Sequence, residues 1–266
     1  MTELDAGPVR LRDWGGAGAP VLLAHGMAAH SGWWDPVVPL WGGVLRAAAL
    51  DFRGHGDSGR TEDGAYAPET WVEDVETARA ALGWERFVLC GHSMGARIAL
   101  RYAAAHPERL RGVVAIDFLT EPRTDRPGRF ARLRNRPQPV YPDEDAASAR
   151  FRLEPDGTAL SAEDLRALGR RSLRPVEGGF TWKFDWRALG VRLDPVWGVL
   201  ARVRVPALLA RGEFSTLMSR EDLARSAREL PGARAVEIPG AHHHVPLDAP
   251  RALAAAIAAF AAGLPE

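Results

Sequence analysis

Short apolar runs alternate along this chain with longer segments of helical periodicity. The runs are bounded by glycine or proline and contain almost no polar residues, a pattern that predicts buried strands with helices on both faces. The predicted buried strands are Val21–Ala24, Leu45–Leu50, Phe87–Cys90, Val113–Ile116, Ala207–Ala210 and Ala235–Ile238. Val9–Trp14 alternates apolar and polar residues instead, which predicts an edge strand.

Four longer segments repeat apolar residues at helical spacing and predict helices that pack on the sheet. They are Pro68–Leu82, Met94–Ala105, Arg220–Leu230 and Pro250–Ala262. Two of them begin at a proline, which suits the first turn of a helix. Strands that alternate with helices are typical of a largely parallel sheet, and 266 residues suit a single α/β core of this kind.

The stretch from residue 119 to about residue 200 breaks the alternation. Proline and arginine become frequent there, no strand is evident, and large aromatic side chains concentrate. An ordered domain seldom carries so long a loop without structure, and the aromatic side chains need to be buried. We therefore expect residues 119–200 to form a mainly helical cap inserted before the penultimate strand, and residues 1–118 and 201–266 to form the core.

Composition and charge exclude several classes of partner. Lysine and arginine total 34 and aspartate and glutamate total 34, so no net charge attracts the protein to nucleic acid or to an anionic membrane. The acidic beginning does not resemble a signal peptide, and no apolar run reaches membrane-spanning length. The single cysteine, Cys90, rules out an internal disulfide framework. We expect a cytoplasmic protein whose partner is a small-molecule substrate; the sequence carries no signal for an oligomeric state.

Residues 91–95 read Gly-His-Ser-Met-Gly and lie between a predicted strand and a predicted helix. A strained turn in that position holds the hydroxyl of Ser93 clear of the sheet, and the flanking glycines leave room for the backbone to bend. The N-terminus of the following helix favours negative charge that develops beside it. Ser93 is therefore the predicted nucleophile, the alternative being an ordinary glycine-rich turn.

With this motif in its context, the sequence resembles the α/β-hydrolase superfamily over nearly all of the chain outside the cap. Residues 24–27 (Ala-His-Gly-Met) are similar to the family's His-Gly segment, and residues 50–59 to its signature loop. The resemblance implies that the backbone N–H groups of Met27 and Met94 form the oxyanion hole. For Asp51, Arg53 and His55 we expect a structural role in the signature loop.

A serine hydroxyl needs a base, and in this fold the base follows late in the chain. Residues 242–244 supply three histidines before Asp248 and Pro250, and the resemblance to the family's Gly-His loop aligns His243 with the base. The competing interpretation is a metal cluster. Three consecutive imidazoles on one loop do not easily converge on one ion, so we expect no metal.

The acid that orients the base departs from the commonest family pattern. In most relatives it follows the strand that matches Ala207–Ala210, but this chain reads Gly-Glu-Phe-Ser over residues 212–215. Some relatives carry the acid at the end of the preceding strand, where this chain has Asp117. We expect Asp117 to be the acid and keep Glu213 as the alternative.

The resemblance implies acyl transfer through an acyl-enzyme on Ser93, without a cofactor, acting on a small or medium ester or lactone with an apolar part. The aromatic residues expected to line the pocket are Trp33, Trp34, Trp182, Phe184, Trp186 and Trp197. Carbon–carbon bond hydrolases, amidases and perhydrolases use the same triad, and the sequence does not separate them. From another class, the same scaffold serves as a ligand receptor with little turnover.

Overall fold

An eight-stranded sheet forms the centre of the computed structural model, which describes residues 1–121, 132–133 and 136–265. Its strands are β1 (Thr2–Ala6), β2 (Val9–Gly15), β3 (Pro20–Ala24), β4 (Arg46–Asp51), β5 (Phe87–His92), β6 (Leu110–Ile116), β9 (Ala207–Gly212) and β10 (Arg234–Ile238). Their order across the sheet is β1-β2-β4-β3-β5-β6-β9-β10. β1–β2 and β2–β4 pair antiparallel, and every other pair is parallel. The predicted α/β fold with a mostly parallel central sheet is confirmed.

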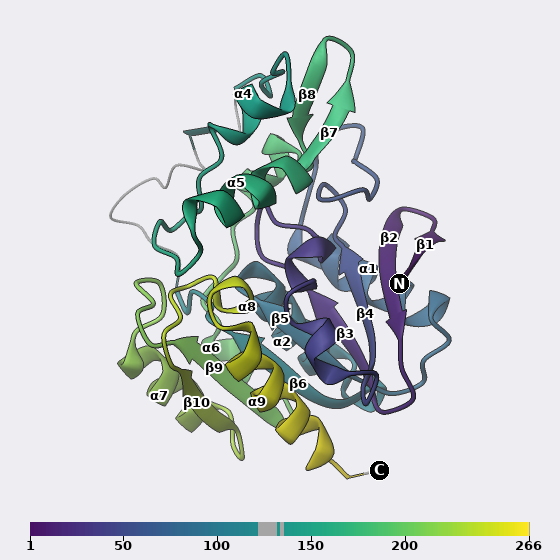
Figure 1. Ribbon diagram of the computed structural model, residues 1–266. Coiled ribbons are helices and arrows are strands. Elements are labelled where there is room, and N and C mark those ends of the chain that lie inside the picture. The colour runs from purple at the N-terminus through teal and green to yellow at the C-terminus, as the bar shows by residue number, and fades with distance from the viewer. Residues whose placement is uncertain (122–131, 134–135, 266) are drawn as a thin grey trace.

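Helices cover both faces of this sheet (Figure 1). They are α1 (Pro68–Ala81), α2 (Met94–Ala105), α7 (Arg220–Glu229) and α9 (Pro250–Ala262), together with the short 3-10 helices η1 (Ser31–Trp34) and η2 (Val38–Trp41). Because successive side chains of a strand point to opposite faces, Leu22 of β3 packs in the core with α1 and α2, whereas Leu23 packs in the core with α9. Within the described residues, no helix combines the length and the apolar character needed to cross a bilayer.

The two edges of the sheet differ from the sequence expectation. β2 is not an edge strand, because β1 pairs with it through a hairpin whose turn contains Gly7 at φ +71°. Most of β1 is exposed, so it lacks the apolar pattern that would have revealed it. β10 was expected to be buried, yet it forms the opposite edge, and only Ile238 of its residues is buried.

The chain between β6 and β9 adds a separate group of elements at one end of the sheet (Figure 1). They are α4 (Glu144–Ser148), α5 (Ala162–Arg171), β7 (Leu173–Val176), β8 (Gly179–Trp182) and η4 (Trp186–Gly190). The short helix α6 (Trp197–Leu200) also precedes β9 but packs against α2 and α7, and α8 (Val245–Asp248) follows β10. β7 and β8 pair antiparallel, whereas the sequence predicted no strand there. Each is four residues long and β7 contains Pro175, so neither carries a strand-like pattern. Residues 122–131 and 134–135 of the expected cap lie outside the described residues.

Candidate active site

Ser93 lies at the turn between β5 and α2 with an unusual backbone conformation. Its φ is +54° and its ψ is −116°, a region that non-glycine residues rarely adopt. The backbone N–H of Ser93 donates to the carbonyl oxygen of Ile116 at the end of β6, at 2.8 Å. The strained turn is therefore held against the neighbouring strand, and the strain is the kind that accumulates at functional sites.

The two glycines of the motif are required by close backbone contacts. A Cβ atom on Gly91 would lie 2.2 Å from the carbonyl oxygen of Gly95. A Cβ atom on Gly95 would lie 2.5 Å from the carbonyl oxygen of Ala24. Neither backbone group can move away easily, so only glycine allows α2 to begin this close to β3.

His243 lies on the loop between β10 and α8, and its ring contacts both Ser93 and Asp117. The Nε2 atom of His243 is 3.1 Å from the Oγ atom of Ser93, and its Nδ1 atom is 2.7 Å from the Oδ1 atom of Asp117. The loop is itself fixed, because Asp248 accepts a hydrogen bond from the backbone N–H of His242 at 2.9 Å. The three residues thus form a continuous chain of hydrogen bonds from carboxylate to imidazole to hydroxyl.

Asp117 follows β6 and is fully buried, with φ at +42°. Besides His243, it accepts hydrogen bonds at 2.7 Å from the backbone N–H of Gly212 and at 2.7 Å from the hydroxyl of Ser215. Sequence reasoning missed both partners. Ser215 was considered only as a replacement for a missing acid; in the structure it donates to the acid that comes from the neighbouring strand.

The side chain of Glu213 contacts the backbone of Gly240 and not the ring of His243. Its carboxylate accepts a hydrogen bond from the backbone N–H of Gly240 at 2.9 Å, and its side chain is partly exposed. This contact joins the ends of β9 and β10, away from the His243 ring. Asp117, and not Glu213, is therefore the carboxylate that the fold brings to His243.

Burial shifts the acid–base behaviour of this pair. It lowers the pKa of His243 well below its ordinary value, and the neighbouring His244 adds to the same effect. Burial also raises the pKa of Asp117 to about 6, while the hydrogen bonds from Gly212 and Ser215 act in the opposite direction. Near neutral pH, His243 is consequently a neutral imidazole able to accept a proton.

The two segments that carry the residues expected to form the oxyanion hole adjoin Ser93. Met94 is the first residue of α2, where backbone N–H groups have no partner within the helix. Met27 lies in a turn in which the N–H of Ala29 donates to the carbonyl oxygen of Gly26. A Cβ atom on Gly26 would lie 3.2 Å from the Cβ atom of Ser93, so this turn adjoins the serine. Both backbone segments therefore adjoin Ser93.

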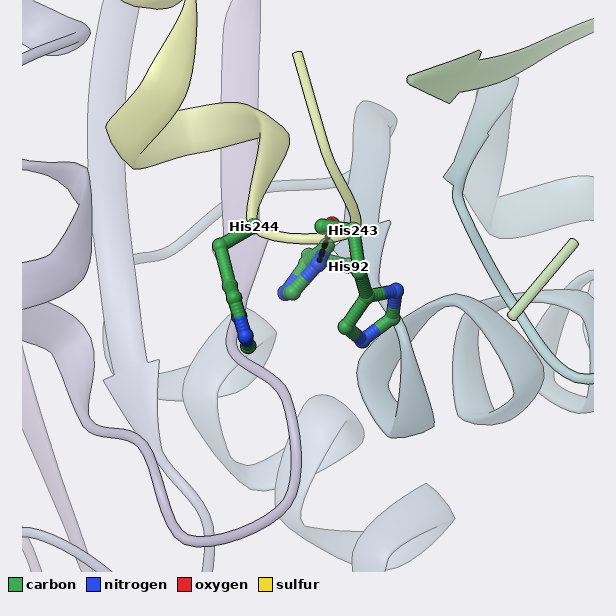
Figure 2. Close-up of side chains that lie close together, drawn as sticks. All are labelled: His92, His243 and His244. Atoms are coloured by element: carbon green, nitrogen blue, oxygen red, sulfur yellow. Dashed lines mark hydrogen bonds between the residues drawn. The ribbon is translucent and has the colours of Figure 1, made fainter. Parts of the chain in front are cut away.

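Two further histidines lie against His243 (Figure 2). The Nε2 atom of His92 donates to the backbone carbonyl of His243 at 2.8 Å, and the rings of these residues are 4.8 Å apart. The ring of His244 lies 4.9 Å from that of His243, and its Nε2 atom donates to the carbonyl oxygen of Pro155 at 2.9 Å. Sequence analysis gave neither residue a role, because their contacts join segments far apart in the chain.

The expected pocket aromatics divide into two groups. Trp33, Trp182, Phe184 and Trp186 belong to one apolar cluster that joins η1 to the insertion. The ring of Trp33 also lies 5.6 Å from that of His244. Trp34 instead packs in the core beside α9, and Trp197 lies under the guanidinium of Arg225 at 3.7 Å. These two side chains therefore pack outside the apolar cluster that contains Trp33.

The signature loop after β4 is held by buried polar contacts. One carboxylate oxygen of Asp51 accepts from the N–H of Ser31 at 2.6 Å, and the other accepts from the N–H of Asp57 at 2.9 Å. The guanidinium of Arg53 donates to the buried carboxylate of Asp74 at 2.5 Å. The contacts of Asp51 and Arg53 thus fix the loop and do not reach Ser93.

Comparison with known proteins gives a consistent result. A family model described as alpha/beta hydrolase fold matches residues 19–250. The chain is 35% identical to a serine hydrolase-like protein of Danio rerio, an alignment that covers 96% of this chain and 85% of that protein. It is 27% identical to an esterase of Mycobacterium tuberculosis, covering 95% of this chain and 86% of that protein.

A solved structure extends the likeness to three dimensions. The chain is 31% identical to 2-(acetamidomethylene)succinate hydrolase of Mesorhizobium japonicum, over 86% of this chain and 83% of that protein. The crystal structure of an E-2-(acetamidomethylene)succinate hydrolase superposes with a TM-score of 0.81 at 29% identity, covering 97% of both chains. The likeness therefore extends over nearly the whole chain.

Proposed function

This chain belongs to the α/β-hydrolase family, and we propose that it hydrolyses a small or medium ester or lactone through an acyl-enzyme on Ser93. The family match and the hydrolase relatives make it an enzyme of the hydrolase class rather than a receptor. The observation that carries the proposal is the hydrogen-bond chain from Asp117 through His243 to Ser93, with distances of 2.7 Å and 3.1 Å.

In the first half of the reaction, the Oγ atom of Ser93 attacks the carbonyl carbon of the substrate while the Nε2 atom of His243 takes the hydroxyl proton. The N–H groups of Met27 and Met94 stabilise the negative charge on the carbonyl oxygen. Asp117 stabilises the imidazolium that forms. The carbon–oxygen bond to the alcohol then breaks, and His243 gives its proton to the departing oxygen.

In the second half, a water molecule attacks the acyl-enzyme while His243 again takes a proton. Collapse of the second tetrahedral intermediate breaks the bond to Ser93, and His243 returns the proton to the Oγ atom. The products are the carboxylic acid and the free serine. Apart from the substrate and water, these steps use only groups that the chain supplies.

The proposed preference for an apolar substrate rests on the insertion, which we propose is a cap over the site. The apolar cluster joins Trp33 of η1 to Phe151, Leu153 and Trp182 of the insertion. Polar contacts tie the same segments together: the Nε2 atom of His30 is 3.1 Å from the Oγ atom of Ser172. We propose that this cluster borders the bound substrate, which favours an apolar acyl or alcohol group.

An amide is the second candidate substrate. The observation in its favour is the 31% identity to a hydrolase whose named substrate carries an acetamido group. The same triad cleaves both bond types, so the choice depends on the leaving group that His243 has to protonate.

The test is a panel of nitrophenyl esters and nitroanilides with acyl chains of increasing length, assayed with wild type and with Ser93→Ala. We expect ester turnover that depends on chain length and disappears in Ser93→Ala. Fluorophosphonate should label wild type at Ser93 and leave the variant unlabelled. Hydrolysis that survives the substitution refutes the proposal, and turnover of anilides alone favours the amide.

A further inference from the structure

Three buried imidazoles converge beside Ser93, and only one of them has a place in the proposed reaction. One ring nitrogen of each of His92, His243 and His244 lies within 4.8 Å of one ring nitrogen of each of the other two. Figure 2 shows the three side chains close together, His92 coming from the end of β5 and the other two from the loop before α8. The sequence argument against a metal considered only residues 242–244; the fold replaces His242 with His92.

The hydrogen bonds of the cluster determine which nitrogen of each ring carries a proton. A carbonyl oxygen only accepts, so the Nε2 atoms of His92 and His244, which contact the carbonyls of His243 and Pro155, are N–H donors. The Nδ1 atom of His243 donates to Asp117 for the same reason. Each ring is left with one lone pair, on Nδ1 of His92, Nδ1 of His244 and Nε2 of His243.

This arrangement matches the surroundings of histidines that bind metals. Such a histidine almost always donates its second ring N–H to a carbonyl or carboxylate, which fixes the tautomer and strengthens the ligand. All three rings of the cluster have such an acceptor. The Nδ1 atom of His244 is buried and has no hydrogen-bond partner among the described residues, although a buried lone pair without a partner costs free energy.

We propose that His92, His243 and His244 bind a transition-metal ion such as Zn²⁺, and that the bound ion inhibits the hydrolase. Zinc takes imidazole nitrogens at about 2.0–2.1 Å, which places two of its ligands about 3.3 Å apart. One nitrogen of each ring lies within 4.8 Å of one nitrogen of each of the other two, so binding requires the rings to move toward one another. Water completes the coordination.

Inhibition follows from the lone pair that the ion occupies. The Nε2 atom of His243 now faces the hydroxyl of Ser93 at 3.1 Å, and the same lone pair would bind the metal. A coordinated imidazole cannot accept the serine proton, so the nucleophile is not activated. The inhibition rests on the proposed role of His243, whereas the binding of the ion does not.

The test uses the intact protein and three single variants. His92→Gln and His244→Gln each place an amide nitrogen near the former Nε2 atom, so they keep a donor for the carbonyl and remove the Nδ1 lone pair. His242→Gln is the matched control, because it removes a histidine from the same loop without touching the cluster. Thermal melting verifies that each variant is folded.

Zn²⁺ binding is measured by calorimetry, and inhibition of ester hydrolysis is measured relative to each variant's own metal-free rate. We expect wild type and His242→Gln to bind one Zn²⁺ and to be inhibited, with Mg²⁺ ineffective because it prefers oxygen ligands. His92→Gln and His244→Gln should bind Zn²⁺ at least tenfold more weakly. Loss of Zn²⁺ binding in these two variants supports the site even if no ester is hydrolysed. A lack of ester hydrolysis counts only against the proposed function. Absence of binding to wild type, or equal loss in His242→Gln, overturns the inference.

Discussion

Replacing Asp117 by asparagine tests the proposed triad most directly, because it changes one atom of a buried side chain. Asp117 accepts three hydrogen bonds: Gly212 donates to Oδ2, while Ser215 and His243 donate to Oδ1. Asparagine offers one acceptor oxygen and one donor NH₂ group in the same space. Neither orientation of the amide satisfies all three donors.

If the NH₂ group faces Gly212, two buried donors oppose each other, at a cost of about 1–3 kcal/mol. If it faces His243, the ring must accept at Nδ1 and carry its proton on Nε2, where it can no longer accept from Ser93. Both orientations also remove the negative charge that stabilises the imidazolium. The same substitution in serine proteases lowers turnover about 10⁴-fold, so we expect a loss of about 10³–10⁴ in kcat.

The assay compares kcat for a nitrophenyl ester in Asp117→Asn and in Glu213→Gln. The second variant is the matched control, because glutamine keeps an oxygen that accepts from Gly240. We expect less than a threefold change there, and thermal melts should show both variants folded. A large loss in Glu213→Gln together with a small one in Asp117→Asn would refute the assignment of the acid.

Three further outcomes follow from the structure. Ser215→Ala removes a hydrogen bond to a carboxylate, worth about 1.5–3 kcal/mol, and should lower kcat about tenfold or more without abolishing activity in the ester assay. Gly95→Ala should destabilise the fold by about 1–3 kcal/mol or more in denaturant unfolding, because its Cβ meets backbone, whereas Gly198→Ala, with open space around it, should not. Burial lowers the pKa of His55 from 6.5 to about 3, so the contribution of the neutral side chain to the free energy of unfolding is complete above pH 6.5 and falls by about 1.4 kcal/mol per pH unit below that value. The substitution His55→Gln should reduce this slope in unfolding measured from pH 7 to pH 5.

The sequence predicted the central part of the sheet because those strands are buried on both faces. Both α2 and α9 begin and end where helical periodicity placed them. The elements that were missed are those without an apolar signal: β1 is mostly exposed, and β7 and β8 are four residues long. Such strands are stabilised by pairing with a neighbour, and pairing is not visible in a local pattern.

The sequence predicted those residues of the candidate site that belong to a local motif. Ser93 is marked by the turn between strand and helix, and His243 by its place before Asp248. His92 lies inside the motif, yet its contact with the carbonyl of His243 crosses 151 positions of the chain. No spacing rule predicts such a contact, because it depends on how the loop before α8 folds over the end of β5.

The acid follows a different strand than in the commonest family pattern, yet it reaches the same histidine. β6 and β9 are adjacent parallel strands, so their carboxyl ends lie side by side, and a carboxylate on either one can reach the same imidazole. In this chain the carboxylate, Asp117, directly follows β6. The end of β9 and the segment after it supply two donors, the N–H of Gly212 and the hydroxyl of Ser215. In the commonest family pattern the acid follows β9, whereas here it follows β6 and the end of β9 supplies the hydrogen-bond donors. A second carboxylate at position 215 would place two negative charges at one buried ring, so the serine there accompanies the aspartate at 117 for a physical reason.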